Sequence, residues 1–166
     1  MVLTLMLVLG SVSLWAQSVP KAEVYGGFSA VNIDDPGFKT TPFGWAASVN
    51  ANVHKVVGIV GDFSGNYRDG NKFHSFLGGT QFTSRLDKVS VFAQTKAGML
   101  RAETGTSSTH FQLGFGGGID WNVNDKVAVR LAQFDWLPTK EKAPATGWVK
   151  NITRLSAGVV FKSKAK

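Results

Sequence analysis

The chain has 166 residues, no cysteine, and 18 lysines and arginines against 11 aspartates and glutamates. This length fits one domain, and the lack of cysteine excludes a disulfide framework or a thiolate metal site. The formal charge of +7 comes from basic residues scattered one or two at a time. This scatter argues against a nucleic-acid partner, which needs a basic stripe, so we expect an anionic lipid or lipopolysaccharide surface instead.

The first 20 residues, "MVLTLMLVLGSVSLWAQSVP", carry no charged side chain. The apolar run from Leu3 to Leu9 fades into small and polar residues, as in a secretory signal peptide cleaved after Ala16. This run is too short to span a bilayer, which argues against a membrane anchor. We therefore expect a signal peptide over 1–16, a single domain over 17–166, and a bacterial envelope protein.

Beyond this segment, apolar and polar residues alternate through most of the chain. In residues 110–123, for example, Phe111, Leu113 and Phe115 alternate with Gln112 and Gly114. A period of two predicts a β-strand, because successive side chains point to opposite faces of a sheet. In chain order the expected strands are 22–33, 43–53, 56–67, 73–84, 89–102, 110–123, 126–137 and 148–162.

The connections between these strands alternate in length. The long connections are 34–42, 68–72, 103–109 and 138–147, and the short ones are 54–55, 85–88 and 124–125. An even number of strands, each long enough to cross a bilayer when tilted, with long loops on one rim only, is typical of an outer-membrane barrel. The sequence predicts an all-β fold, a closed eight-stranded antiparallel up-and-down transmembrane β-barrel.

The apolar face of each strand carries bulky side chains such as Phe43, Trp45 and Phe115, whereas the other face carries small or polar ones such as Ser48 and Asn50. An eight-stranded barrel has a narrow lumen that side chains of moderate size fill. The bulky face is therefore expected to meet lipid and the polar face to line the lumen.

Charged residues at inward positions are the most informative polar feature. Their opposite signs predict a plug of buried ion pairs, since an unpaired buried charge is costly; the alternative is a gated ion path. Asp135 reaches the lumen only if a β-bulge near Ala132 corrects the phase, because Arg130 inward otherwise places Phe134 and Trp136 inward. The expected lumen charge network is Glu23, Asp62, Lys96, Asp120, Arg130, Asp135 and Arg154.

Several segments, among them "AEVYGGFSAV", "GWAASVNANVHKVVGIVGDFSG", "FGGGIDWNVNDKVAVRLAQFDWLPT" and "NITRLSAGVVFK", resemble the small bacterial outer-membrane β-barrel family related to the transmembrane domain of outer membrane protein A. The resemblance implies a bacterial outer-membrane location and assembly by the barrel-assembly machinery. It also implies that Gly158 and Phe161 are part of the carboxyl-terminal assembly signal. The chain departs from the family pattern by continuing through "KSKAK", where Ser163 occupies an expected aromatic position.

Four tryptophans fall near predicted strand ends: Trp45, Trp121, Trp136 and Trp148. They are expected to form an aromatic girdle at headgroup level, since amphipathic rings settle there; the alternative is a carbohydrate-stacking surface.

Catalytic and metal-binding patterns are weak. The histidines are dispersed and none has metal-ligand spacing with another: His54, His74 and His110. His74 beside Ser75, or His110 with Ser107 and Glu103, resembles a lipid hydrolase only in composition, since neither set has a nucleophile motif. We expect no catalytic residue, no metal and no cofactor.

The leading hypothesis is an outer-membrane barrel with a structural or surface-interaction role through four extracellular loops and a plugged lumen. One alternative is a barrel enzyme that modifies lipid A or phospholipid. The other is a soluble lipocalin-like binding barrel. The surface ligand is not indicated by the sequence.

Overall fold

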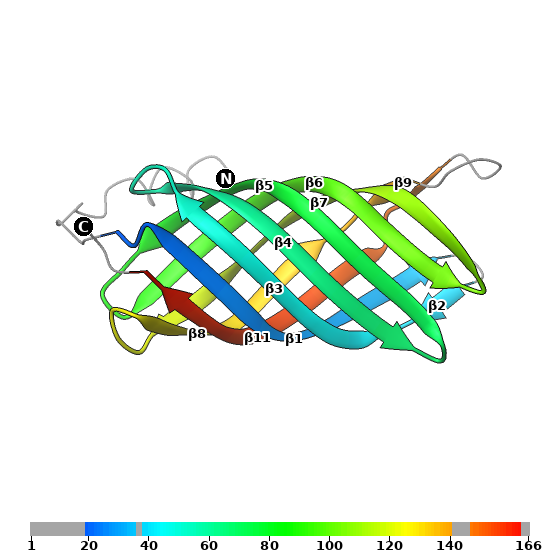
Figure 1. The fold of residues 1–166 in the computed structure, drawn as a ribbon, viewed down its shortest axis with the longest axis horizontal. Coiled ribbons are helices and arrows are strands. Elements are labelled where there is room, and N and C mark those ends of the chain that lie inside the picture. Colours follow the sequence, from blue (N-terminus) through cyan, green and yellow to red (C-terminus); the bar gives the residue numbers. More distant parts are fainter. Residues whose placement is uncertain (1–18, 36–37, 141–146, 164–166) are drawn as a thin grey trace, which may run out of the picture.

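The structure is a computed structural model that describes residues 19–35, 38–140 and 147–163, so the expected signal peptide lies outside the described residues. Antiparallel strands form one closed barrel (Figure 1). No helix of the described residues is long and apolar enough to cross a membrane. The strands are β1 (Ala22–Asp35), β2 (Phe38–Thr40), β3 (Phe43–Asn52), β4 (Val57–Arg68), β5 (Asn71–Arg85), β6 (Val89–Thr104), β7 (Thr106–Asn122), β8 (Val127–Trp136), β9 (Thr139–Lys140), β10 (Trp148–Val149) and β11 (Ile152–Lys162).

The barrel closes between its first and last long strands. β1 pairs with β3 on one side and with β11 on the other, so Tyr25 lies opposite both Ser48 and Val160. Eight long strands complete the circle, and β2, β9 and β10 are short additions. The first residue of β1, Ala22, and the last residue of β11, Lys162, lie at the same end of the barrel, which we call the terminal end (Figure 1). The opposite end is the distal end.

The two faces of the wall have opposite character. Large apolar side chains point outward, and Phe111 and Phe115 are 48% and 42% exposed. Polar side chains such as Asn50 and Gln112 are buried in the lumen. The predicted fold class and the predicted direction of the bulky side chains are confirmed, and a lipocalin-like barrel with its apolar face inside is excluded.

A bulge interrupts β8 where the sequence predicts one. Ile119 of β7 pairs with Ala132, but the next residue, Asp120, pairs with Arg130. Leu131 of β8 therefore has no partner on β7. The pairing with β11 shifts at the same point. Leu131 and Ala132 are both exposed, and the inward phase therefore passes from Arg130 to Gln133 and then to Asp135.

The distal connections differ from the prediction. Two of the four expected long loops are tight turns: Asp69 and Gly70 join β4 to β5 with φ of 50° and 79°, and Gly105 joins β6 to β7 with φ of 79°. Two successive residues with positive φ make a two-residue hairpin turn of the kind that Asp-Gly favours. The strands continue into the expected loops, and the wall of β5, β6 and β7 is 15 to 17 residues long against 10 for β3 and β8.

The other two distal connections carry the short strands. β9 continues the β8 register along β7, since Phe115 faces Trp136 and Gln112 faces Thr139. β10 then pairs with β9, and β2 folds back on β1. Parts of both predicted loops are thus extensions of the barrel wall.

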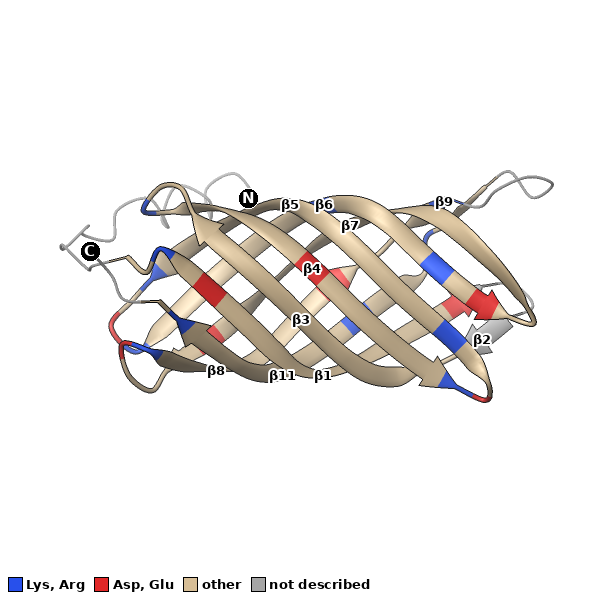
Figure 2. Cartoon of the chain, viewed as in Figure 1, with Lys and Arg blue, Asp and Glu red and all other residues tan. Residues whose placement is uncertain are grey.

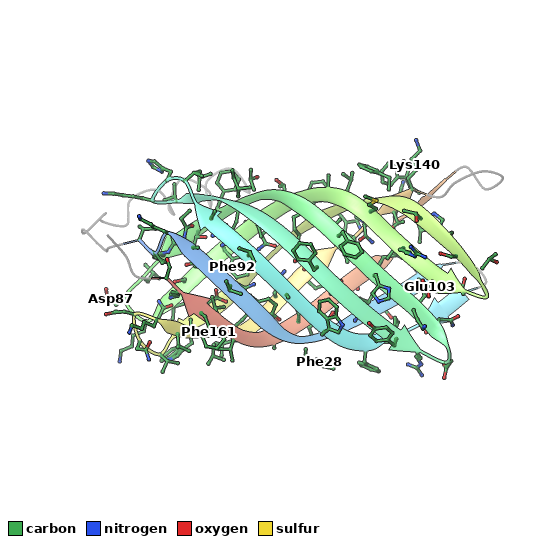
Figure 3. The ribbon with its side chains drawn as sticks, in the orientation of Figure 1. Phe28, Asp87, Phe92, Glu103, Lys140 and Phe161 are labelled. Carbon is green, nitrogen blue, oxygen red and sulfur yellow. The ribbon has the colours of Figure 1, made fainter. Side chains whose placement is uncertain are left out.

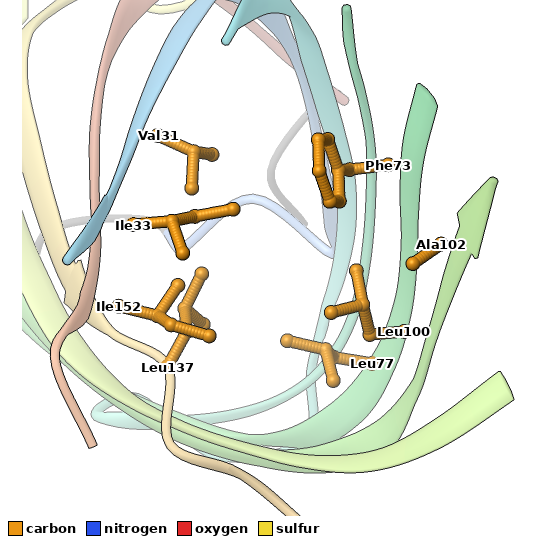
Figure 4. Packing of buried hydrophobic residues seen from close by; sticks show 8 residues of the cluster. All are labelled: Val31, Ile33, Phe73, Leu77, Leu100, Ala102, Leu137 and Ile152. Atoms are coloured by element: carbon orange, nitrogen blue, oxygen red, sulfur yellow. The ribbon is translucent and has the colours of Figure 1, made fainter. Parts of the chain in front are cut away.

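The distal part of the lumen is apolar, contrary to the expectation that the whole lumen is polar. Its side chains come from four long strands, β1, β5, β6 and β11, and from the residue directly after β8, and they pack together inside the barrel (Figure 4). We call this group the apolar layer. It comprises Val31, Ile33, Phe73, Leu77, Leu100, Ala102, Leu137 and Ile152.

Candidate functional site: the charged lumen

Two acids and two bases meet in the middle of the lumen, and we call them the central network. Asp62 is on β4, Lys96 on β6, Asp135 on β8 and Arg154 on β11. Lys96 Nζ lies 3.1 Å from Asp62 Oδ2 and 3.0 Å from Asp135 Oδ1. Arg154 Nη2 lies 2.8 Å from Asp62 Oδ2 and 2.7 Å from Asp135 Oδ2.

The central network carries no net charge, because it contains two carboxylates and two cations. Each carboxylate contacts both cations. Its side chains are at most 3% exposed. Gln133 Nε2 also donates to Asp135 Oδ2 at 2.8 Å. Buried charges are tolerated when they are paired and hydrogen-bonded in this way, whereas the loss of one partner strands a charge. The bulge in β8 is essential here, since it turns both Gln133 and Asp135 inward.

A second ion pair lies toward the terminal end. Arg130 Nε and Nη2 donate to the two oxygens of Asp120 at 2.8 and 3.0 Å, a bidentate arrangement. The guanidinium also lies over the rings of Tyr25 and Phe92, at 4.4 and 4.2 Å from their centroids. Arg130 Nη1 donates to Gln133 Oε1 at 2.7 Å, which links this pair to the central network.

Glu23 belongs to a third group, at the rim of the terminal end. It accepts from Arg85 Nη2 at 3.1 Å and from Asn50 Nδ2 at 3.2 Å. Glu23 and Arg154 lie on the neighbouring strands β1 and β11 but at different heights, since Glu23 pairs with Lys162 and Arg154 pairs with Val31. Arg85 was expected in a turn, but it ends β5 on the same face as Gln81 and Thr83, and that alternation could have placed it in the lumen.

Neutral polar side chains fill the levels between these groups. Gln94 Nε2 donates to Gln81 Oε1 at 2.7 Å, beside the Arg130 pair. Toward the distal end, Ser75 donates to Gln112 at 2.8 Å and Gln112 donates to Thr139 at 2.9 Å. This chain of hydrogen bonds lies within the apolar layer, since Ser75 stands between Phe73 and Leu77 on β5. All seven residues of the expected charge network are buried in the lumen, but they form three groups (Figure 2).

The two residues of the expected assembly signal lie on opposite faces of β11. Phe161 points outward and is 59% exposed (Figure 3). Gly158 packs against β1 so closely that a Cβ would lie 2.3 Å from Gly26 O and 2.5 Å from Gly27 Cα. A side chain at this position would push the first and last strands apart. The structure thus shows that Gly158 allows β1 and β11 to pack closely and that Phe161 is exposed on the outer wall. The role of these two residues in assembly stays a prediction.

The four tryptophans of the expected girdle are exposed on the outer wall at 41–45%. Trp45 and Trp136 lie near the distal ends of β3 and β8, and Trp121 lies near the terminal end of β7. Trp148, on β10, meets Phe111 edge to face at 6.3 Å. Three of the four thus lie toward the distal end.

The residues of the possible hydrolase do not form a catalytic set. His74 points outward and contacts Tyr67, whereas Ser75 points inward and contacts Gln112. His110 Nε2 lies 2.8 Å from Ser108 Oγ rather than from Ser107. In the described part of the chain, no three acidic, histidine or cysteine side chains form a metal-binding group.

A closed eight-stranded barrel with an apolar outer wall and buried charges in its lumen has the architecture of a small transmembrane β-barrel of the outer-membrane type. No family profile matches the chain, and no curated protein matches it in sequence. Solved structures do match, and they share the fold at low identity.

Neisserial surface protein A is similar over 86% of this chain and 97% of its own, with 15% identity and a TM-score of 0.72. Ail, the attachment invasion locus protein of Yersinia pestis, gives 16% identity and a TM-score of 0.59, over 86% of this chain and 98% of its own. The amino-terminal β-barrel domain of Pseudomonas aeruginosa OprF gives 10% identity and a TM-score of 0.55, over 86% and 97%. The chain has the fold of these barrels.

Proposed function

We propose that the protein is an outer-membrane barrel with a structural or surface-interaction role, whose lumen is plugged and does not conduct as a general pore. The observation that supports this proposal is the series of buried side chains along the lumen. Three ion-paired groups, a glutamine layer and the apolar layer occupy successive parts of it. An eight-stranded barrel has a lumen just wide enough for side chains to fill, so we infer that these residues close it to ions.

Planar-bilayer recording tests the plug. The wild-type protein should give no stable channels of large conductance, because an ion would have to displace both a paired charge layer and an apolar layer. Stable, large channels from the wild-type protein would refute the plug.

The surface role is supported by the distal end, where the two longer connections add the short strands β2, β9 and β10 to the barrel wall. Among the similar barrels, Neisserial surface protein A and the Yersinia attachment protein carry surface roles in their names. We propose that the distal end faces the outside and that the barrel-assembly machinery inserts the chain. Fractionation of a native host tests the location, since the protein should require detergent for release; recovery in the soluble periplasm would end the proposal.

An enzyme that modifies lipid A or phospholipid is the rejected alternative. Since His74 and Ser75 lie on opposite faces of β5, one site cannot use both. Purified protein should therefore leave labelled lipid A and phospholipid intact. Robust turnover that is lost on His110→Ala would show that the barrel is an enzyme.

A further inference from the structure

The outer wall carries its charge unevenly at the distal end. Lys72 on β5 and Arg101 on β6 point outward with side chains 56% and 55% exposed, and Glu103 lies between them. Glu103 contacts Arg101 Nε at 3.3 Å and Lys72 Nζ at 3.9 Å. Lys140, on β9, is exposed at the same end of the barrel as Glu103 (Figure 3). We call these four residues the distal cation patch.

Strand register makes the distal cation patch continuous. Arg101 pairs with Thr109 on β7, and two residues further along β7 Phe111 pairs with Lys140. Lys140 in turn pairs with Trp148, whose ring packs on Phe111. The cations therefore follow one side of the barrel across adjoining strands, directly beside aromatic rings of the kind that settle at headgroup level.

On β1, β3 and β11 the described outward side chains near the distal end carry no cation, and they include Asn32, Phe43 and Thr153. Two other exposed cations lie at this end. Arg68, at the end of β4, lies 3.4 Å from Asp69 and donates to the carbonyl of Thr41, and Lys150 lies in the connection between β10 and β11. Lys72, Arg101 and Lys140 are the exposed cations that β5, β6 and β9 carry beside the long strand β7.

We propose that the distal cation patch binds the headgroup of an anionic glycolipid that carries two phosphate groups, with its acyl chains on the apolar wall below. From Lys72 to Lys140 the patch crosses three strand spacings, or about 14 Å, which is wider than a single phosphate. Below the patch, Phe76 pairs with Met99, and Phe115 packs on Trp136. Phosphates above and acyl chains below is the chemistry of lipid A in an outer leaflet. This inference rests on the proposed outer-membrane location and distal orientation.

Glu103 has a defined part in this arrangement. It orients Lys72 and Arg101 in the absence of lipid but adds nothing to phosphate binding. A cation near a membrane surface contributes about fivefold in affinity for anionic lipid, so loss of all three cations should weaken binding on the order of 100-fold. Neutralising Glu103 should leave the affinity equal or higher.

Native mass spectrometry of the full folded protein, titrated in zwitterionic micelles with diphosphoryl lipid A, tests the site. The variant K72A/R101A/K140A should bind on the order of 100-fold more weakly than wild type. The control K55A/K88A/K126A, which removes three exposed lysines at the terminal end, should bind as wild type does. E103Q should bind at least as tightly as wild type.

The choice of lipid separates the sources of phosphate. The wild-type protein should prefer diphosphoryl over monophosphoryl lipid A and over phosphatidylglycerol, and the triple variant should lose that preference. Equal affinity of the two triple variants, or of wild type for all three lipids, would overturn the proposal. So would a patch-dependent binding of heparin with unchanged lipid A affinity, since the partner would then be a soluble polyanion.

Folding is checked separately. If K72A/R101A/K140A fails to fold, the single variant K140E tests the site, and it should bind lipid A more weakly than wild type does. K140E should fold, because β9 is a two-residue strand outside the eight long strands. A wild-type chain that never inserts into vesicles would refute the proposed function itself. A chain that inserts and shows no phosphate-dependent affinity would refute only the distal cation patch.

Discussion

The central network and the apolar layer are neighbours in the lumen, and β6 and β11 contribute to both. On β11 the inward position changes from Arg154 to Ile152, and beyond the bulge of β8 the inward position changes from Asp135 to Leu137. The central network requires particular partners, because every charge lacks water and must be matched. The apolar layer requires only volume and apolar character. Two adjacent regions of one lumen should therefore tolerate substitution very differently.

The largest effect is expected from the double variant Asp62→Ala with Asp135→Ala. Lys96 and Arg154 would then have no carboxylate partner in the central network. One buried charge without its partner costs about 3–5 kcal/mol, so two such charges should leave no folded barrel. Electrophoresis without boiling, in which a folded barrel migrates as a compact form, measures this. The double variant Asp87→Ala with Asp125→Ala, which removes two exposed acids at the terminal end, is the control and should leave the compact form intact.

The second effect concerns one partner of the central network. Asp135→Ala should lower the free energy of unfolding by about 3–5 kcal/mol, because Lys96 and Arg154 then share only Asp62. Urea titration followed by tryptophan fluorescence in vesicles measures the loss. The double variant Asp135→Ala with Lys96→Met should recover part of it, since the remaining pair is neutral. Exposed Asp125→Ala should change the stability by less than about 0.5 kcal/mol.

A smaller effect is expected in the apolar layer. Leu137 is 1% exposed, and Leu137→Ala should cost about 2–3 kcal/mol in the same titration, toward the low end for a buried leucine. Leu137→Met should cost less than about 1.5 kcal/mol, because it conserves volume. If Leu137→Met is as damaging as Asp135→Ala, the contrast between the two regions is wrong.

The smallest effect should come from the rim of the terminal end. Arg85 and Glu23 are both partly reached by water, with side chains 10% and 11% exposed. Arg85→Ala should cost about 1 kcal/mol, and about 1 M salt should reduce this difference by screening. The cost of Asp135→Ala should change little with salt, and equal salt dependence of the two variants would contradict the burial of the central network.

Strand positions and faces follow from the sequence because alternation depends on local geometry alone. The bulge at Leu131 and Ala132 was predictable in the same way, since Arg130 and Asp135 cannot both face the lumen without it. The tight turn at Asp69 and Gly70 was also signalled, because Asp-Gly between alternating segments favours a two-residue hairpin. The predicted connection over 68–72 is therefore longer than the two-residue turn in the structure.

The apolar layer was within reach of the same reasoning. Lys96 inward places Leu100 and Ala102 inward, as Glu23 inward places Val31 and Ile33. The Asp120–Arg130 and Asp135–Arg154 pairs join adjacent strands in register, but the ion pairs of Lys96 were not predictable, because they join strands that are not neighbours. Lys96 on β6 reaches across the lumen to Asp62 on β4 and to Asp135 on β8, and one sequence holds no information on how strand tilt brings their heights together.

The two tight distal turns have a consequence for how the protein meets its surroundings. β1 and β11 are paired, so the two longer connections, from β1 to β3 and from β8 to β11, flank the seam where the barrel closes. The long strands β5, β6 and β7 form one side of the distal mouth, and these two connections belong to the other side. A residue added to the turn at Asp69 and Gly70, or at Gly105, would interrupt paired strands, whereas a residue added in 34–42 or 138–147 leaves the eight long strands paired. Under the proposed outward orientation, pressure from antibodies and phages should therefore change the sequence mainly in 34–42 and 138–147.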